Sequence, residues 1–125
     1  MRLVTLLLGC CFAVACTINQ TCEDDHCVCA DNEACQHTCT PGGLDCHIEC
    51  SASTTCDVNC ATNEDCHVEA FTAQHATVDC AGSTECNVTC PPGGCTVRNC
   101  ANSSCTVACS GGSLPSLNGT TATCQ

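Results

Sequence analysis

Apolar and polar positions alternate in short blocks that recur about every ten residues between Cys46 and Cys109. Each block spans five residues with the consensus C-x-V-x-C, so its first, third and fifth positions are apolar. Alternation around a β-branched residue is typical of a half-buried strand. The third position is β-branched in all seven blocks, namely Ile48, Val58, Val68, Val78, Val88, Val97 and Val107. Small and polar residues between the blocks predict tight turns.

A fixed repeat of this length predicts stacked, solenoid-like architecture. We therefore expect an all-β fold, a small disulfide-stapled parallel β-solenoid with ten-residue rungs and irregular Cys-rich ends. Four segments are expected: a signal peptide at residues 1–15, an irregular Cys-rich leading segment at 16–45, the solenoid repeats at 46–109, and a Gly/Ser/Thr-rich tail at 110–125 that forms a loop.

The composition explains what must hold such a fold together. The chain has 125 residues with 21 cysteines, two phenylalanines and neither Trp nor Tyr, so large side chains for a conventional core are missing. Arg2, an apolar run over residues 3–14 and Ala-Val-Ala at 13–15 form a signal-peptide pattern. Export leads to an oxidising space where disulfides persist. The sequence thus predicts a secreted or cell-surface protein that is cross-linked by disulfides.

The repeat also predicts which cysteines pair. The first and fifth positions of one extended block lie about 13 Å apart, whereas a disulfide needs Cα atoms roughly 4.4–6.8 Å apart. A bridge therefore joins either the fifth position to the next first position across a turn, or equal positions on neighbouring rungs. Ala70 and Ala76 favour the turn bridge, because they replace both partners of one such bridge.

Applied along the chain, the turn rule predicts nine bridges: Cys22–Cys27, Cys29–Cys35, Cys39–Cys46, Cys50–Cys56, Cys60–Cys66, Cys80–Cys86, Cys90–Cys95, Cys100–Cys105 and Cys109–Cys124.

One cysteine after the signal, Cys16, has no partner under this rule. A small residue followed by Cys at the end of a signal is similar to a lipobox, so Cys16 is a candidate for lipidation. Ordinary signal-peptidase cleavage is the alternative. A lipobox-like Cys ahead of an acidic Cys repeat resembles uncharacterised lipoproteins of myxobacterial type. That resemblance implies an outer-membrane lipoprotein that contacts the membrane only through its anchor.

The Cys-periodic coil with small residues resembles the disulfide-laced β-solenoids of insect antifreeze proteins over about half of the chain. The resemblance implies ice binding. However, no block carries Thr at both outward positions, and Asp79 and Arg98 would interrupt a flat Thr plane. Ice or glycan binding is therefore only a third hypothesis.

Charge and outward residues point to a different ligand class. The net charge is −11, which disfavours nucleic acid and favours cations or basic partners. Outward positions of the first three blocks hold imidazoles and carboxylates that suit Zn²⁺ or Cu²⁺: His47, Glu49, Asp57, His67 and Glu69. If successive blocks stack, His47 and His67 lie two rungs apart, roughly 9–10 Å. The alternative is a plain solvated face.

Catalysis has little support in the sequence. No nucleophile–base pair and no Gly-rich phosphate loop is visible, and one C-x-C without any C-x-x-C disfavours a metallothionein. We therefore predict a non-enzymatic scaffold without a resident cofactor that binds a protein, a glycan or a cation, with divalent-metal binding as the alternative.

Overall fold

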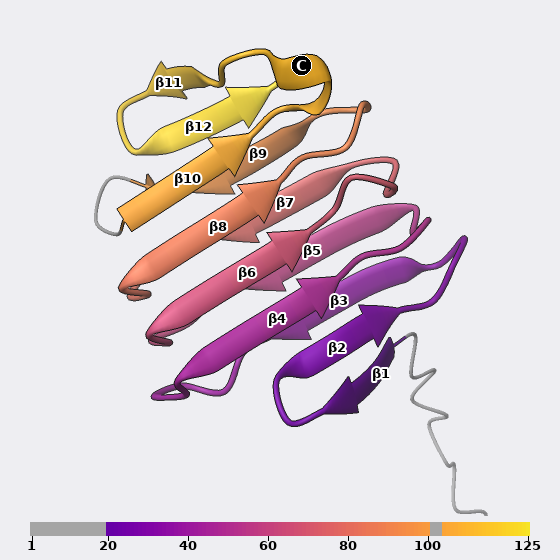
Figure 1. Ribbon diagram of the computed structural model, residues 1–125, viewed down its shortest axis with the longest axis vertical. Coiled ribbons are helices and arrows are strands. Elements are labelled where there is room, and N and C mark those ends of the chain that lie inside the picture. Colours follow the sequence, from indigo (N-terminus) through magenta and orange to yellow (C-terminus); the bar gives the residue numbers. More distant parts are fainter. Residues whose placement is uncertain (1–19, 101–103) are drawn as a thin grey trace, which may run out of the picture.

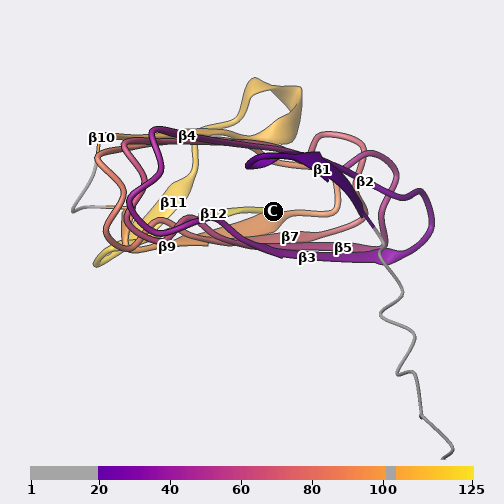
Figure 2. The same cartoon turned by 90° about the horizontal axis from the view of Figure 1, so that it is seen from below.

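The computed structural model describes residues 20–100 and 104–125, which form a flattened β-solenoid (Figures 1 and 2). Two six-stranded sheets lie face to face, so the predicted all-β solenoid fold is confirmed. The front sheet contains, in spatial order, β1 (Gln20–Glu23), β2 (His26–Cys29), β4 (Asp45–Glu49), β6 (Asp65–Glu69), β8 (Glu85–Thr89) and β10 (Ser104–Ala108). The back sheet contains β11 (Ser116–Asn118), β12 (Thr121–Cys124), β9 (Cys95–Arg98), β7 (Ala76–Asp79), β5 (Thr55–Asn59) and β3 (Ala34–Thr38).

One coil of the solenoid contains two of the ten-residue blocks, one in each sheet. Parallel pairing joins Cys46 to Cys66 and Cys66 to Cys86 in the front sheet, so neighbours in a sheet are twenty residues apart. The expectation that successive blocks stack on each other is therefore wrong. The reason is that each turn carries the chain over to the opposite sheet, and a second turn must bring it back before a parallel neighbour can form.

The core is a single layer of Cys and Val side chains between the sheets. Ile48, Val68, Val78 and Val97 are fully buried. Nine disulfides form with the same partners that the turn rule predicts. Eight of them join one sheet to the other, and Cys22–Cys27 links β1 to β2 within the front sheet. At the Cys50–Cys56 corner, for example, the Cα atoms lie 5.8 Å apart. The bridges therefore draw the sheets together where large side chains are missing.

The alanine pair of the irregular repeat occupies the same corner position as a disulfide. Ala70 and Ala76 are 0% and 1% exposed, as buried as the cysteines of neighbouring coils. In the back sheet, Ala76 is the register partner of Cys56, and Val78 is the register partner of Val58. The loss of this bridge leaves the register of the coil unchanged.

The leading segment is not irregular over the residues that the structure describes. β2 pairs in parallel with β4, and β3 pairs with β5 with Cys35 opposite Cys56. The repeat is hidden there because the central position of β3 is His37 instead of Val. Its half-buried ring contacts Gln20 Nε2 through Nδ1 at 3.0 Å, so a polar residue replaces the usual apolar one.

The C-terminal tail also departs from the expected loop. β11 and β12 form an antiparallel pair, and β12 continues the back sheet by pairing antiparallel with β9, with Ala122 opposite Val97. At the other end, β1 pairs antiparallel with β2. Antiparallel strands thus flank the parallel coils at both ends.

The predicted signal peptide and the lipidation candidate Cys16 lie outside the described residues. Within residues 20–100 and 104–125, no helix is long and apolar enough to cross a membrane.

Candidate metal-binding face

Three histidines form a column on the outer surface of the front sheet. Strand register places His26 opposite His47 and His47 opposite His67, on β2, β4 and β6. Their ring centroids are 4.4 Å apart for the first pair and 4.8 Å for the second, whose rings are stacked. The rings point outward because the neighbouring residues in each strand, such as Cys46 and Ile48, fill the core. We call this column the histidine ladder.

A carboxylate lies against the middle and upper rungs of the ladder. Glu69 Oε1 is 3.4 Å from His67 Nε2 and 3.8 Å from His47 Nε2. All three side chains are between 28% and 38% exposed, so solvent and ions reach them. Glu49 is the register partner of Glu69 on β4. The ladder therefore has nitrogen donors in line and oxygen donors along one side.

A second line of carboxylates flanks the ladder on its other side. Asp45, Asp65 and Glu85 are opposite one another on β4, β6 and β8. One oxygen of Asp65, Oδ1, is buried and has no hydrogen-bond partner among the described residues. All 13 acidic residues of the chain lie between Glu23 and Glu85, which concentrates negative charge on the coils that carry the ladder.

Four of the five predicted metal ligands share this face, and one does not. His47, Glu49, His67 and Glu69 lie on the front sheet. The prediction that Asp57 joins them is wrong, because Asp57 is on β5 of the back sheet, between Gln36 and Thr77. The expected stacking of successive blocks also predicts His47 and His67 two rungs apart, whereas they are direct register partners on adjacent strands. Because alternate blocks belong to opposite sheets, a residue ten positions away cannot join the ladder.

His26 is not among the five metal ligands that the sequence predicts. It lies 21 residues before His47, close to the 20 that separate His47 from His67, so its spacing was a usable signal. The signal was weak because Cys27, instead of Val, lies opposite Ile48 in the next coil. The ten-residue C-x-V-x-C repeat therefore does not extend to β2.

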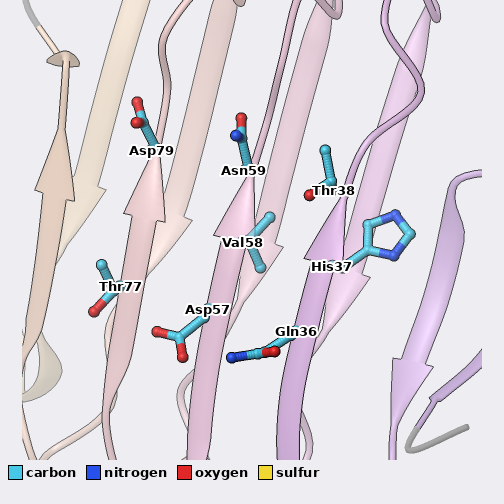
Figure 3. Close-up of a pocket in the computed structure, with 8 residues that line it drawn as sticks. All are labelled: Gln36, His37, Thr38, Asp57, Val58, Asn59, Thr77 and Asp79. Atoms are coloured by element: carbon cyan, nitrogen blue, oxygen red, sulfur yellow. The ribbon is translucent and has the colours of Figure 1, made fainter. Parts of the chain in front are cut away.

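The back sheet carries a shallow polar depression around Asp57, drawn in Figure 3. Two of its side chains already have partners: Asn59 Oδ1 accepts from the Ala61 amide at 2.9 Å, and Asp79 Oδ1 accepts from Asn99 Nδ2 at 2.7 Å. The ring of His37 lies apart from the Asp57 carboxylate in Figure 3. The depression thus offers isolated polar groups without a nucleophile–base contact.

The cysteines offer no metal ligands in the described part of the chain. Tight groups of donor atoms occur where His37 lies near Cys22 and Cys27 or near Cys39 and Cys46. All of these cysteines are in disulfides, as are the other described cysteines. A disulfide sulfur is not a thiolate, and the thiolate is the form that binds metal.

The back sheet also limits the resemblance to antifreeze proteins. Thr77, Thr96 and Thr123 form one column of register partners. In the neighbouring column, Asp79 is opposite Arg98, so charges replace the second row of Thr. The described part of the back sheet therefore lacks the paired Thr face on which the ice-binding hypothesis depends.

Comparison of the chain with known protein families, with curated proteins and with solved structures finds no match.

Proposed function

We propose that this protein is an exported, non-enzymatic scaffold that presents rigid polar faces to a binding partner. The observation that supports this proposal is the distribution of side chains between the two sides of each strand. Inward positions are filled mostly by Cys, Val and Ala, whereas the imidazoles of His26, His47 and His67 project from the outer face of the front sheet. Disulfides at the corners hold those faces at a fixed spacing with little core to support them.

Two features support export. Nine disulfides indicate folding in an oxidising environment, and the signal-peptide pattern before Cys16 supplies a route to it. The eighteen described cysteines are all paired with one another, so none of them is left as a partner for Cys16, the lipidation candidate. The acidic face favours cationic or basic partners over nucleic acid.

Intact mass spectrometry of the mature protein tests this proposal, because one measurement reports cleavage, lipid and disulfides. We expect a chain that begins at Cys16, carries a lipid and gains eighteen hydrogens on full reduction, two for each of nine bridges. Cys16→Ser should release the protein into the medium with unchanged thermal stability. A retained signal, or thiols that react before reduction, would contradict export of this scaffold.

A second candidate function is divalent-metal binding by the front sheet. It is favoured by the contacts of one carboxylate, Glu69, with the Nε2 atoms of both His47 and His67. Imidazole and carboxylate together suit Zn²⁺ or Cu²⁺. Calorimetric titration with Zn²⁺ tests it: the double variant His47→Ala, His67→Ala should lose binding, and His75→Ala is the matched control. Equal heats for the two variants would exclude this site.

A further inference from the structure

We infer that His26 is a third imidazole ligand, so that the front sheet carries a three-histidine site for one Zn²⁺, Cu²⁺ or Ni²⁺ ion. This inference rests on the metal-binding candidate above. It adds a ligand from β2 and defines the class of ion. The observation that carries it is the continuity of the histidine ladder across β2, β4 and β6.

The backbone fixes the positions from which the three side chains start. His26 and His47 are register partners, as are His47 and His67, so the three residues lie on adjacent hydrogen-bonded strands. Adjacent strands are about 4.8 Å apart. Disulfides such as Cys39–Cys46 and Cys60–Cys66 begin at the ends of β4 and β6 and hold these strands in the coil. The ladder is therefore held in place before any ion arrives.

The side chains must rotate to bring three nitrogens onto one ion, because stacked rings hold their lone pairs in parallel planes. The His26 and His47 rings meet edge to face at 4.4 Å with an angle of 65°, whereas the His47 and His67 rings are stacked at 9°. His26 is exposed and the other two are partly exposed, so each ring can turn without disturbing the core. An ion above His47 can then be bound by ring nitrogens of His26 and His67 as well.

The carboxylates complete the coordination and attract the ion. Glu69 Oε1 already lies 3.4 Å from His67 Nε2 and 3.8 Å from His47 Nε2, which places an anionic oxygen between two donor nitrogens. Glu23 is the register partner of His26 on β1, and Glu49 is the partner of Glu69. Negative charge on both sides of the ladder raises the local concentration of cations.

The donor set selects the class of ion. Three imidazole nitrogens with one carboxylate suit borderline transition metals such as Zn²⁺, Cu²⁺ and Ni²⁺. Ca²⁺ and Mg²⁺ require oxygen ligands in larger number. We therefore expect the folded, oxidised protein to bind Zn²⁺ and Cu²⁺ in the presence of excess Ca²⁺.

Calorimetric titration of His26→Ala with Zn²⁺ separates this inference from the simpler two-histidine site. We expect the variant to bind at least about tenfold more weakly than the wild type, since even partners beyond the ligand shell are worth roughly 10–100-fold in metal affinity. His75→Ala is the control, because this exposed histidine contacts Gly93 in a turn and is not on the front sheet. It should bind as the wild type does.

The outcomes distinguish the two levels of the proposal. Wild-type affinity in His26→Ala, with binding lost in His47→Ala, would overturn the three-histidine site and keep the two-histidine candidate. No binding to the wild type would overturn both. Two ions per chain, or equal affinity for Ca²⁺, would also overturn the inference. Non-reduced mass and circular dichroism of each variant verify that its disulfides and sheets are intact.

A spectroscopic readout avoids mutation altogether. The chain has five histidines, and substoichiometric Cu²⁺ broadens the nuclear magnetic resonances of protons near the ion. We expect broadening of the ring signals of His26, His47 and His67, while those of His37 and His75 remain. If the His26 signal stays sharp while the His47 and His67 signals broaden, His26 is not a ligand.

Discussion

At the scale of single residues, the corners of the coil restrict which side chains fit. Ser51 and Ala61 follow the last cysteine of their blocks and have positive φ angles of 32° and 50°, a conformation usually reserved for Gly or Asn. Neither Ser nor Ala predicts a positive φ angle from the sequence. The corner disulfides Cys50–Cys56 and Cys60–Cys66 enclose these positions, so the closed coil imposes the conformation.

Gly93 should tolerate no side chain. A Cβ at this position would collide with the carbonyl oxygen of Gln74 in the neighbouring coil. We expect Gly93→Ala to lower the free energy of unfolding by about 2–3 kcal/mol, because backbone must move to make room. Guanidinium unfolding without reductant, followed by far-ultraviolet circular dichroism, measures this.

Gly111→Ala is the matched control for that substitution. Gly111 has open space around it but a φ of +72°, so only the backbone conformation opposes the new side chain. The expected cost is about 1 kcal/mol. If the two variants are equally stable, the contact between neighbouring coils at Gln74 is looser than the structure indicates.

At the scale of the repeat, the ten-residue block is a half-coil, and a bridge closes each regular corner except that of Ala70 and Ala76. The turn rule could be derived from sequence because Ala70 and Ala76 are lost together, and the bridges follow it along the whole described chain. The extent of the coil could not be derived from the sequence. His37 occupies a central position that is otherwise apolar, and one substitution was enough to break the pattern that defines the repeat.

The alanine corner should accept a tenth disulfide. Ala70 and Ala76 are buried and have the six-residue separation of Cys60–Cys66, whose Cα atoms are 5.7 Å apart. Ala70→Cys with Ala76→Cys should form a bridge and stabilise the protein by about 2 kcal/mol through the unfolded state. Peptide mapping identifies the bridge, and denaturant unfolding gives the stabilisation.

The single variant Ala70→Cys is the control, because it adds a buried thiol without a partner and should bring no gain. Mixed pairing of the new cysteines with Cys60 or Cys80 would refute the equivalence of this corner with the others.

At the scale of the whole molecule, covalent links replace a large core. The buried side chains are mostly Cys, Val and Ala, and no aromatic residue is among them in the described part of the chain. Each short bridge contributes on the order of 2 kcal/mol. The bridges constrain one another and do not add ideally, yet together they are comparable with the roughly 5–15 kcal/mol that stabilises a whole domain.

Full reduction should therefore unfold the protein. We expect the β-sheet circular dichroism to disappear in a phosphine reductant at room temperature and to survive heating without it. Mass spectrometry after alkylation verifies that all eighteen described cysteines have reacted. Persistence of the sheet signal in the fully alkylated chain would show that packing alone sustains the solenoid.

The strand blocks, the inward Cys and Val positions, the corner bridges and the solenoid class could all be predicted from the sequence. These features depend on alternation along one strand and on the short distance across one turn, which are local. Which blocks are neighbours could not be predicted, because this depends on how many turns the chain makes before it returns to the same sheet. The pairing of every second block brings His26, His47 and His67 together and separates Asp57 from them.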